Sequence, residues 1–181
     1  MKTFIPFLLS IICIVLVMLE GSVANILIHL PFIPDDWQVT SHFLLLFTLY
    51  ITIFFDQRNT YYGFAFAVLF GLIIDILYTP VIGIYLFVYG VVLYVARNLM
   101  KWLHANFFVT VLIVAIGVII ADIATYFLYG MIQFHHMNWN TYFVERLVPT
   151  FIWNILLSIV FYPFIKKNLR KWERIKFLNK D

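Results

Sequence analysis

The run from Tyr61 to Gly83 constrains the fold most strongly, because it is apolar except for one charged residue, Asp75. Four residues recur at every fourth position of this run and would share one face of a helix: Gly63, Ala67, Gly71 and Asp75. Small residues at this spacing let two membrane helices approach closely. An acid within a membrane helix costs roughly 2.5–3.5 kcal/mol on insertion scales, so it usually faces protein or water. The run therefore predicts a membrane helix with a packing face.

Composition extends this prediction to the whole chain. Of the 181 residues, 64% are hydrophobic and 12% are charged, whereas soluble domains contain about 25% charged residues. A single water-soluble core could not bury so much apolar surface, so we predict an all-α integral membrane protein. The only cysteine, Cys13, excludes an intrachain disulfide. Seven of the twelve Lys and Arg residues lie in the last sixteen positions, which indicates a contact with a membrane surface or a protein rather than nucleic acid.

We predict a single bundle of six transmembrane helices, followed by a basic amphipathic cytoplasmic tail over residues 166–181. The expected spans are residues 5–28, 37–55, 61–77, 81–96, 107–129 and 143–165. A cleavable signal peptide is the alternative for the first span, but its apolar run from Phe4 to Leu19 exceeds the usual 7–15 residues. The second span is the weakest, because its apolar core over 43–55 is shorter than the ~17 residues that usually cross a bilayer.

Charge predicts the orientation. With six spans, eleven of the twelve basic residues fall on one side of the membrane, and only Arg146 falls on the other. The positive-inside rule then places both termini in the cytoplasm of a bacterial cell, with the chain in the plasma membrane. If the second span did not cross, this bias would weaken.

The same orientation places the ionisable residues of the spans in their outer halves. Asp122 and Glu20 are too short to reach the surface from their depth, so we expect a buried partner or a wet cavity for each. Arg146 is the cation available at that level. We therefore predict a buried charge network in which Arg146 pairs with at least one of three acids: Glu20, Asp75 and Asp122.

Motifs for catalysis are missing from the sequence, which contains no H-E-x-x-H, G-x-S-x-G or Walker A pattern. We predict no enzyme activity, no cofactor and no metal site. Two weak alternatives are a proteolytic pair of intramembrane aspartates and an external metal site. The second would draw on loop residues: His29, Asp35, Asp36, His42, His135 and His136.

The tail combines basic residues with apolar ones at every third position, namely Leu169, Trp172, Ile175 and Leu178. This pattern predicts an interfacial helix that contacts anionic lipid or a cytoplasmic partner, although a simple topology anchor explains it equally well. The residues expected to make the contact are Lys166, Lys167, Arg170, Lys171, Trp172 and Arg174.

The segment GLIIDILYTPVIGIYLFVY, from Gly71 to Tyr89, resembles the G-L-x-x-D-x-x…G core of the MreD family of rod shape-determining proteins. Four residues match that motif directly: Gly71, Leu72, Asp75 and Gly83. The preceding Tyr61-Tyr62-Gly63, the chain length, the number of spans and the basic tail look like the Gram-positive branch of the family.

The resemblance implies a non-enzymatic membrane scaffold of the cell-elongation machinery. Its implied partners are a single-span membrane protein similar to MreC, filaments similar to MreB, and the peptidoglycan synthases. The family also looks similar in fold to the substrate-binding subunits of energy-coupling-factor vitamin transporters. A small-molecule uptake subunit is therefore the alternative function, although the first span lacks the A-x-x-x-A strip that such subunits share.

Two roles remain open for the third span. It could dock the partner helix through five residues: Gly63, Ala67, Gly71, Asp75 and Gly83. Alternatively, the same strip could pack within the protein's own bundle. The sequence does not decide between them.

Overall fold

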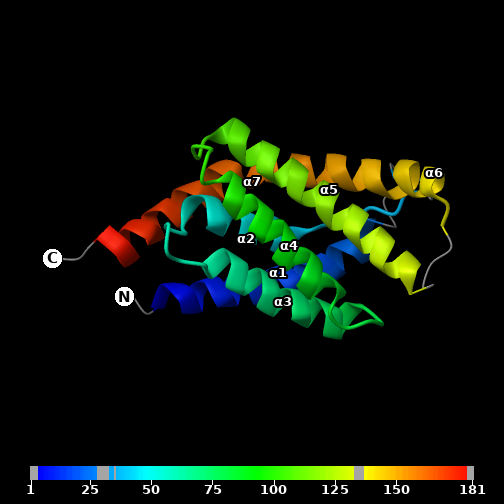
Figure 1. Ribbon diagram of the computed structural model, residues 1–181, viewed down its shortest axis with the longest axis horizontal. Coiled ribbons are helices and arrows are strands. Elements are labelled where there is room, and N and C mark those ends of the chain that lie inside the picture. The colour runs from blue at the N-terminus through cyan, green and yellow to red at the C-terminus, as the bar shows by residue number, and fades with distance from the viewer. Residues whose placement is uncertain (1–3, 28–32, 35, 133–136, 179–181) are drawn as a thin grey trace.

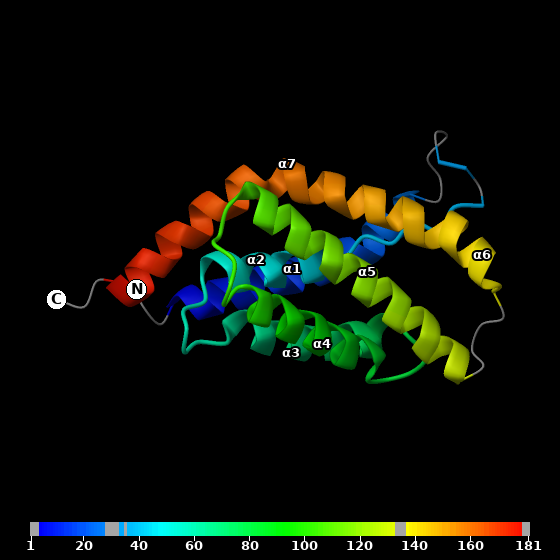
Figure 2. The same ribbon diagram turned by 45° about the horizontal axis from the view of Figure 1, so that its top comes forward.

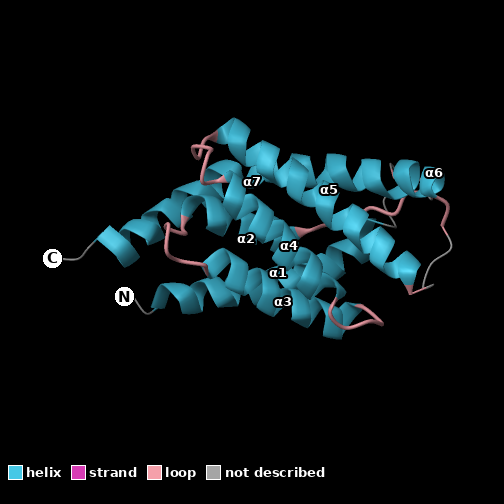
Figure 3. Cartoon of the chain, in the orientation of Figure 1, coloured by secondary structure: helices cyan, strands magenta, loops and turns pink. Residues whose placement is uncertain are grey.

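The computed structural model describes residues 4–27, 33–34, 36–132 and 137–178, and every regular element in these ranges is helical (Figure 3). The first five helices are α1 (Phe4–Leu27), α2 (Phe43–Phe54), α3 (Tyr62–Tyr78), α4 (Ile84–Leu99) and α5 (Phe107–Met131). Four consecutive elements then form one rod: α6 (Trp139–Tyr142), the π-helical turn η1 (Phe143–Leu147), α7 (Val148–Glu173) and the π-helical turn η2 (Arg174–Leu178).

Three of these rods have the length and apolar composition of helices that cross a membrane, as expected for a membrane protein. They are α1, α5 and the rod that begins at Trp139. The other three, α2, α3 and α4, are equally apolar but shorter, with 12, 17 and 16 residues.

The six rods run alternately up and down the long axis of the molecule (Figure 1). Figures 1 and 2 both place the N-terminal and C-terminal ends of the chain at the same end of the bundle. The α2–α3 and α4–α5 connections lie at that end as well, whereas the α3–α4 turn lies at the opposite end. The two termini, the α2–α3 connection and the α4–α5 connection therefore lie on one side of the bundle.

The short helix α2 is the centre of the bundle. It packs against α1, α3, α4, α5 and α7, and every residue from Leu44 to Phe54 is buried. Because other helices surround α2, it needs neither the length of a lipid-facing helix nor separate lipid-facing and protein-facing sides.

Side chains from outside α3 and α5 satisfy N–H groups at their N-termini. Asp56 accepts hydrogen bonds from the backbone N–H groups of Tyr62 and Gly63, both at 2.9 Å, at the start of α3. Asn106 accepts one from Val109 N–H at 2.8 Å at the start of α5. Burial raises the pKa of Asp56, while these backbone hydrogen bonds oppose the shift.

The second expected span differs from the observed helix at its beginning. Residues 37–42 are not helical, and α2 begins only at Phe43. Asn154 of α7 holds this segment: its Oδ1 accepts from His42 N–H at 2.8 Å, and its Nδ2 donates to Thr40 C=O at 2.7 Å. Thr150 Oγ1 accepts from Thr40 N–H at 3.1 Å. The segment therefore satisfies its backbone through α7 rather than through a helical turn of its own.

The C-terminal tail also differs from the separate interfacial helix expected over 166–181. Helix α7 continues without a break from Val148 to Glu173, because no residue between Ile165 and Glu173 interrupts the helix. Leu169 is fully buried in the bundle, and Trp172 and Ile175 pack against the core. The apolar side of the tail thus contacts this protein's own helices.

Candidate functional site

The carboxylate of Asp75 caps the N-terminus of α4. It accepts hydrogen bonds from three backbone N–H groups, those of Gly83 at 3.0 Å, Tyr85 at 2.9 Å and Leu86 at 3.0 Å. Thr79 Oγ1 adds a long contact at 3.4 Å. The first N–H groups of a helix lack intrahelical partners and carry partial positive charge, so a carboxylate there is stabilising. Asp75 is therefore satisfied within the turn, and no salt bridge joins it to Arg146 in the described residues.

Gly83 provides the bend at this turn. It precedes α4 with a φ of 107°, which is a left-handed backbone conformation that L side chains rarely adopt. Pro80 lies two residues after the end of α3 and cannot continue it. The motif residues Asp75 and Gly83 thus define one tight connection between two antiparallel helices.

The strip of small residues on α3 faces other helices of the bundle. A Cβ atom at Gly63 would collide with Thr52 Oγ1 and lie 2.8 Å from Thr48 C=O, both on α2. A Cβ atom at Gly71 would lie 3.0 Å from Tyr85 C=O, on α4. Ala67, between them, is fully buried. At Gly63 and Gly71 the strip therefore packs closely against α2 and α4 of the same chain.

A cluster of buried and half-buried polar side chains brings together residues from α1, the start of α2, α4, α5 and η1. His42, at the start of α2, lies between two acids: its Nδ1 is 3.9 Å from Glu20 Oε1, and its Nε2 is 3.7 Å from Asp122 Oδ1. Arg146 Nε lies 3.9 Å from the same Asp122 oxygen. Tyr89 of α4 completes the cluster, with its hydroxyl 3.2 Å from His42 Nδ1 and 3.4 Å from Glu20 Oε1. We call these five residues the polar cluster.

The polar cluster combines groups that can carry opposite charges. Two carboxylates face one guanidinium and one imidazole ring. Four buried atoms of the cluster have no hydrogen-bond partner among the described residues: His42 Nε2, Asp122 Oδ1, Asp122 Oδ2 and Arg146 Nε. These groups face each other at 3.7–3.9 Å, which is longer than a direct hydrogen bond.

The structure joins Glu20, Asp122 and Arg146 in this cluster and keeps Asp75 apart from it. Sequence reasoning did not find His42 or Tyr89 as members. His42 follows a polar loop, and nothing local indicates that it packs between acids from α1 and α5. The one available signal was charge: a single cation could not balance all the acids placed in the outer half.

An apolar groove runs along the outside of α2, between α1 and α7. Its volume is about 320 Å³. The lining residues recur at helical spacing on three helices: Ile12, Leu16 and Leu19 on α1; Phe43, Leu46, Phe47 and Tyr50 on α2; and Phe161, Phe164, Ile165, Asn168 and Trp172 on α7. Sequence reasoning missed it, because the apolar rows belong to segments that are far apart in the chain.

The basic residues of the tail line a second hollow, of about 510 Å³, on another side of α7. It contains five cations, Lys166, Lys167, Arg170, Lys171 and Arg174, together with Pro163 and Ile175. Trp172, which was expected to share this surface, lies in the apolar groove instead. The helix therefore separates a basic side from an apolar one.

The alternative of an external histidine site involves His29, Asp35, His135 and His136, which lie outside the described residues. Within the described part of the chain, no group of three His, Cys, Asp or Glu side chains is placed to hold a metal ion.

Comparisons with known proteins agree over almost the full chain. A family model described as rod shape-determining protein MreD matches residues 2–172. The chain is also similar to the rod shape-determining protein MreD of Bacillus subtilis (strain 168). The two are 30% identical over 179 residues, which cover 94% of this chain and 99% of the relative. No solved structure gives a significant match.

Proposed function

This chain belongs to the MreD family of rod shape-determining proteins, and we propose that it acts in cell shape as a non-enzymatic membrane scaffold. In this role it binds a single-span partner similar to MreC and thereby links filaments similar to MreB to peptidoglycan synthesis. The observation that carries the proposal is the apolar groove between α1, α2 and α7, in which one more helix can pack.

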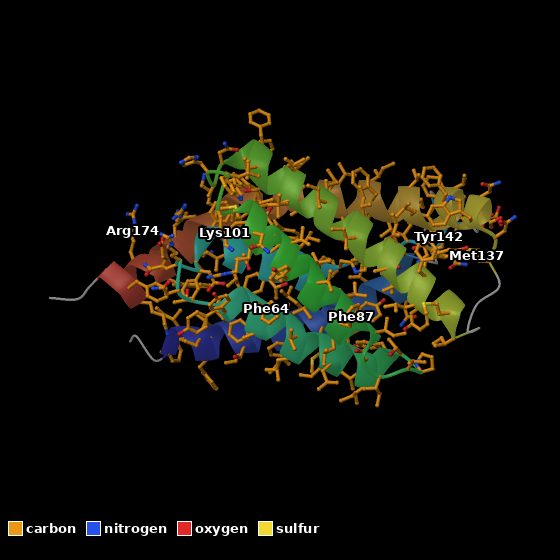
Figure 4. All side chains as sticks on the ribbon, viewed as in Figure 1. Phe64, Phe87, Lys101, Met137, Tyr142 and Arg174 are labelled. Atoms are coloured by element: carbon orange, nitrogen blue, oxygen red, sulfur yellow. The ribbon has the colours of Figure 1, made fainter. Side chains whose placement is uncertain are left out.

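We infer that all six rods cross the bacterial plasma membrane, with both termini in the cytoplasm. The alternating course of the rods and the common end of the termini support this orientation (Figure 2). Figure 4 labels Lys101 and Arg174 near that end, and Met137 and Tyr142 near the other. Basic residues gather on the cytoplasmic side of membrane proteins.

The shape of the groove favours a helix as its occupant. Its three walls are rows at i, i+3, i+4 and i+7 spacing, which is the pattern that an added helix meets in helix-in-groove recognition. On α1 the row from Ile12 to Leu19 extends about 10 Å at 1.5 Å per residue. Leu19, Phe161 and Phe164 on the walls are exposed. A single-span partner can cover them while it stays within the bilayer.

Filling the groove tests this function. Leu16 lines the groove, whereas Met18 of the same helix is exposed on another side. We expect Leu16→Trp to abolish co-purification of the single-span partner and to leave rod-shaped cells rounded, without lowering thermal stability in detergent. Met18→Trp, the matched control, should keep both the partner and the rod shape. A Leu16→Trp protein that keeps the partner and supports rod shape would remove the groove from the proposal.

A second function, the small-molecule uptake subunit, is favoured by one feature. A cavity of about 480 Å³ opens beside Glu20, and its lining includes the polar side chains of Ser22, Asn25 and Thr79. Polar groups that converge on a cavity are typical of ligand sites. A small molecule that co-purifies in stoichiometric amount and is lost on Glu20→Gln would favour this function over the scaffold.

A further inference from the structure

The basic hollow on α7 carries a strong excess of positive charge. Glu173 pairs with Arg170 at 3.2 Å. Among the described residues, no carboxylate lies within ion-pair distance of Lys166, Lys167, Lys171 or Arg174. Like charges held close together repel, so an anion from outside the chain would stabilise this arrangement.

Aromatic side chains of the bundle hold two of these cations in place. Lys166 Nζ donates a hydrogen bond to Tyr162 Oη at 2.9 Å and lies 5.0 Å from the centre of that ring. The Arg170 guanidinium lies 5.5 Å from the ring of Phe54 on α2. These contacts order one side of the hollow. Lys167, Lys171 and Arg174 remain exposed.

The same face of α7 continues as an apolar stripe toward the other end of the helix. The stripe and the cations follow one another at intervals of three or four residues, which keeps them on one side of a helix. The positions are Ile152, Leu156, Ile159, Pro163, Lys167, Arg170 and Arg174. Ile152, Leu156 and Ile159 are exposed by 49%, 53% and 41%. The apolar stripe and the cations therefore form one continuous face of α7.

The dimensions of this face match those of one lipid leaflet. Leu156 and Lys167 are separated along the axis by about 16 Å at 1.5 Å per residue. Half of a hydrocarbon core of ~30 Å is about 15 Å. An acyl chain that follows the stripe from Leu156 therefore ends at the level of the cations, where the phosphate of its head group would lie.

We propose that this face of α7 is a binding site for an anionic phospholipid of the cytoplasmic leaflet. The head-group phosphate lies among Lys167, Arg170, Lys171 and Arg174, and an acyl chain lies along Ile159 and Leu156. The site rests on the orientation proposed for the chain. A soluble acidic protein would match the cations but would leave the apolar stripe without a partner, so a lipid fits the whole face better.

Lipid binding to the full-length protein in detergent tests the site. The probes are phosphatidylglycerol and phosphatidylcholine, and the readout is the dissociation constant from native mass spectrometry. The variant is Lys167→Gln with Lys171→Gln. The matched control is Arg58→Gln with Lys101→Gln, which removes two exposed charges from the same end of the bundle.

We expect the unaltered protein to bind phosphatidylglycerol more tightly than phosphatidylcholine. The α7 double variant should weaken phosphatidylglycerol binding about tenfold, at an unchanged unfolding temperature, while the control changes it less than about twofold. Equal losses in both variants, or equal binding of the two lipids, would overturn the site.

Two competitors identify other ligands. If inorganic phosphate displaces phosphatidylglycerol at an equal concentration, the hollow is a site for free phosphate. If a polyglutamate peptide displaces the lipid fully, the hollow is a site for an acidic protein. Each result overturns the lipid site.

Labelling of a cysteine placed at Lys171 tests the orientation separately. Labelling from outside the cell would overturn the orientation and the assignment to the cytoplasmic leaflet, even if the purified protein still prefers phosphatidylglycerol.

Discussion

Asp75 Oδ1 accepts a hydrogen bond from the backbone N–H of Tyr85 at 2.9 Å, across the turn that joins α3 to α4. With the N–H groups of Gly83 and Leu86, three donors at the beginning of α4 depend on this one carboxylate. The most polar residue of the MreD-like motif is therefore a helix cap, and its expected effects are on stability.

Replacement of Asp75 should destabilise the fold. In Asp75→Ala the N–H groups at the start of α4 lose their acceptor in a buried place, so we expect the free energy of unfolding to fall by about 2–3 kcal/mol. Asp75→Asn keeps one acceptor and should lose less. The measurement is unfolding in detergent, with Asp36→Ala at an exposed position as control. Equal stability of Asp75→Ala and the control would contradict the capping role.

The glycines of α3 should differ from a glycine of α4 in their response to alanine. A methyl group at Gly63 would collide with Thr52, whereas at Gly90 it would meet only Val68 Cγ2 at 3.4 Å, an ordinary contact. We expect Gly63→Ala to lower the unfolding temperature. Gly90→Ala should keep or raise it, because alanine is the better helix former by about 1 kcal/mol. If Gly63→Ala were as stable as Gly90→Ala, the close α2–α3 contact would be wrong.

Charge coupling should follow the polar cluster. Arg146 Nε lies 3.9 Å from Asp122 Oδ1, so the double variant Asp122→Asn with Arg146→Gln should be less destabilised than the sum of the single variants. We expect a coupling of about 1–3 kcal/mol for this pair. The pair Asp75 and Arg146 serves as control and should be additive within ~0.5 kcal/mol. Coupling of Arg146 to Asp75 alone would contradict the cluster.

Asn154 should fix the non-helical segment before α2. Its side chain bonds both His42 N–H and Thr40 C=O, so Asn154→Leu leaves these two backbone groups unpaired. We expect faster hydrogen exchange at the backbone N–H of His42 and a loss of about 2 kcal/mol in stability. Asn140→Leu, at an exposed position of α6, is the control. Unchanged exchange at His42 would show that another contact holds the segment.

The sequence was sufficient for the features that depend on local chemistry. The predicted spans over 61–77 and 81–96 left only a short connection between them, and the observed α3 and α4 begin and end within three residues of these ranges. Repeated small residues also predicted a close-packing face on α3. In each case neighbouring residues determine the structure.

Other features depend on contacts between distant segments. In a helix that is apolar on all sides, periodicity does not distinguish the lipid-facing side from the buried one. For this reason the sequence could not place the strip of Gly63 and Gly71 against α2 and α4, nor predict that α2 is wholly buried. The partners of His42 are Glu20 and Asp122, which come from two other helices. No local pattern indicates such a pairing.

Cross-linking in native membranes tests the scaffold function most directly. In a Cys13→Ser background, single cysteines at Leu19 and Phe164 line the groove, and a cysteine at Phe87 of α4 provides an exposed position outside it. We predict that Leu19 and Phe164 each cross-link to the same single-span membrane protein, and that Phe87 does not. Cross-linking of that protein to Phe87, with none at Leu19 or Phe164, would contradict docking in the groove.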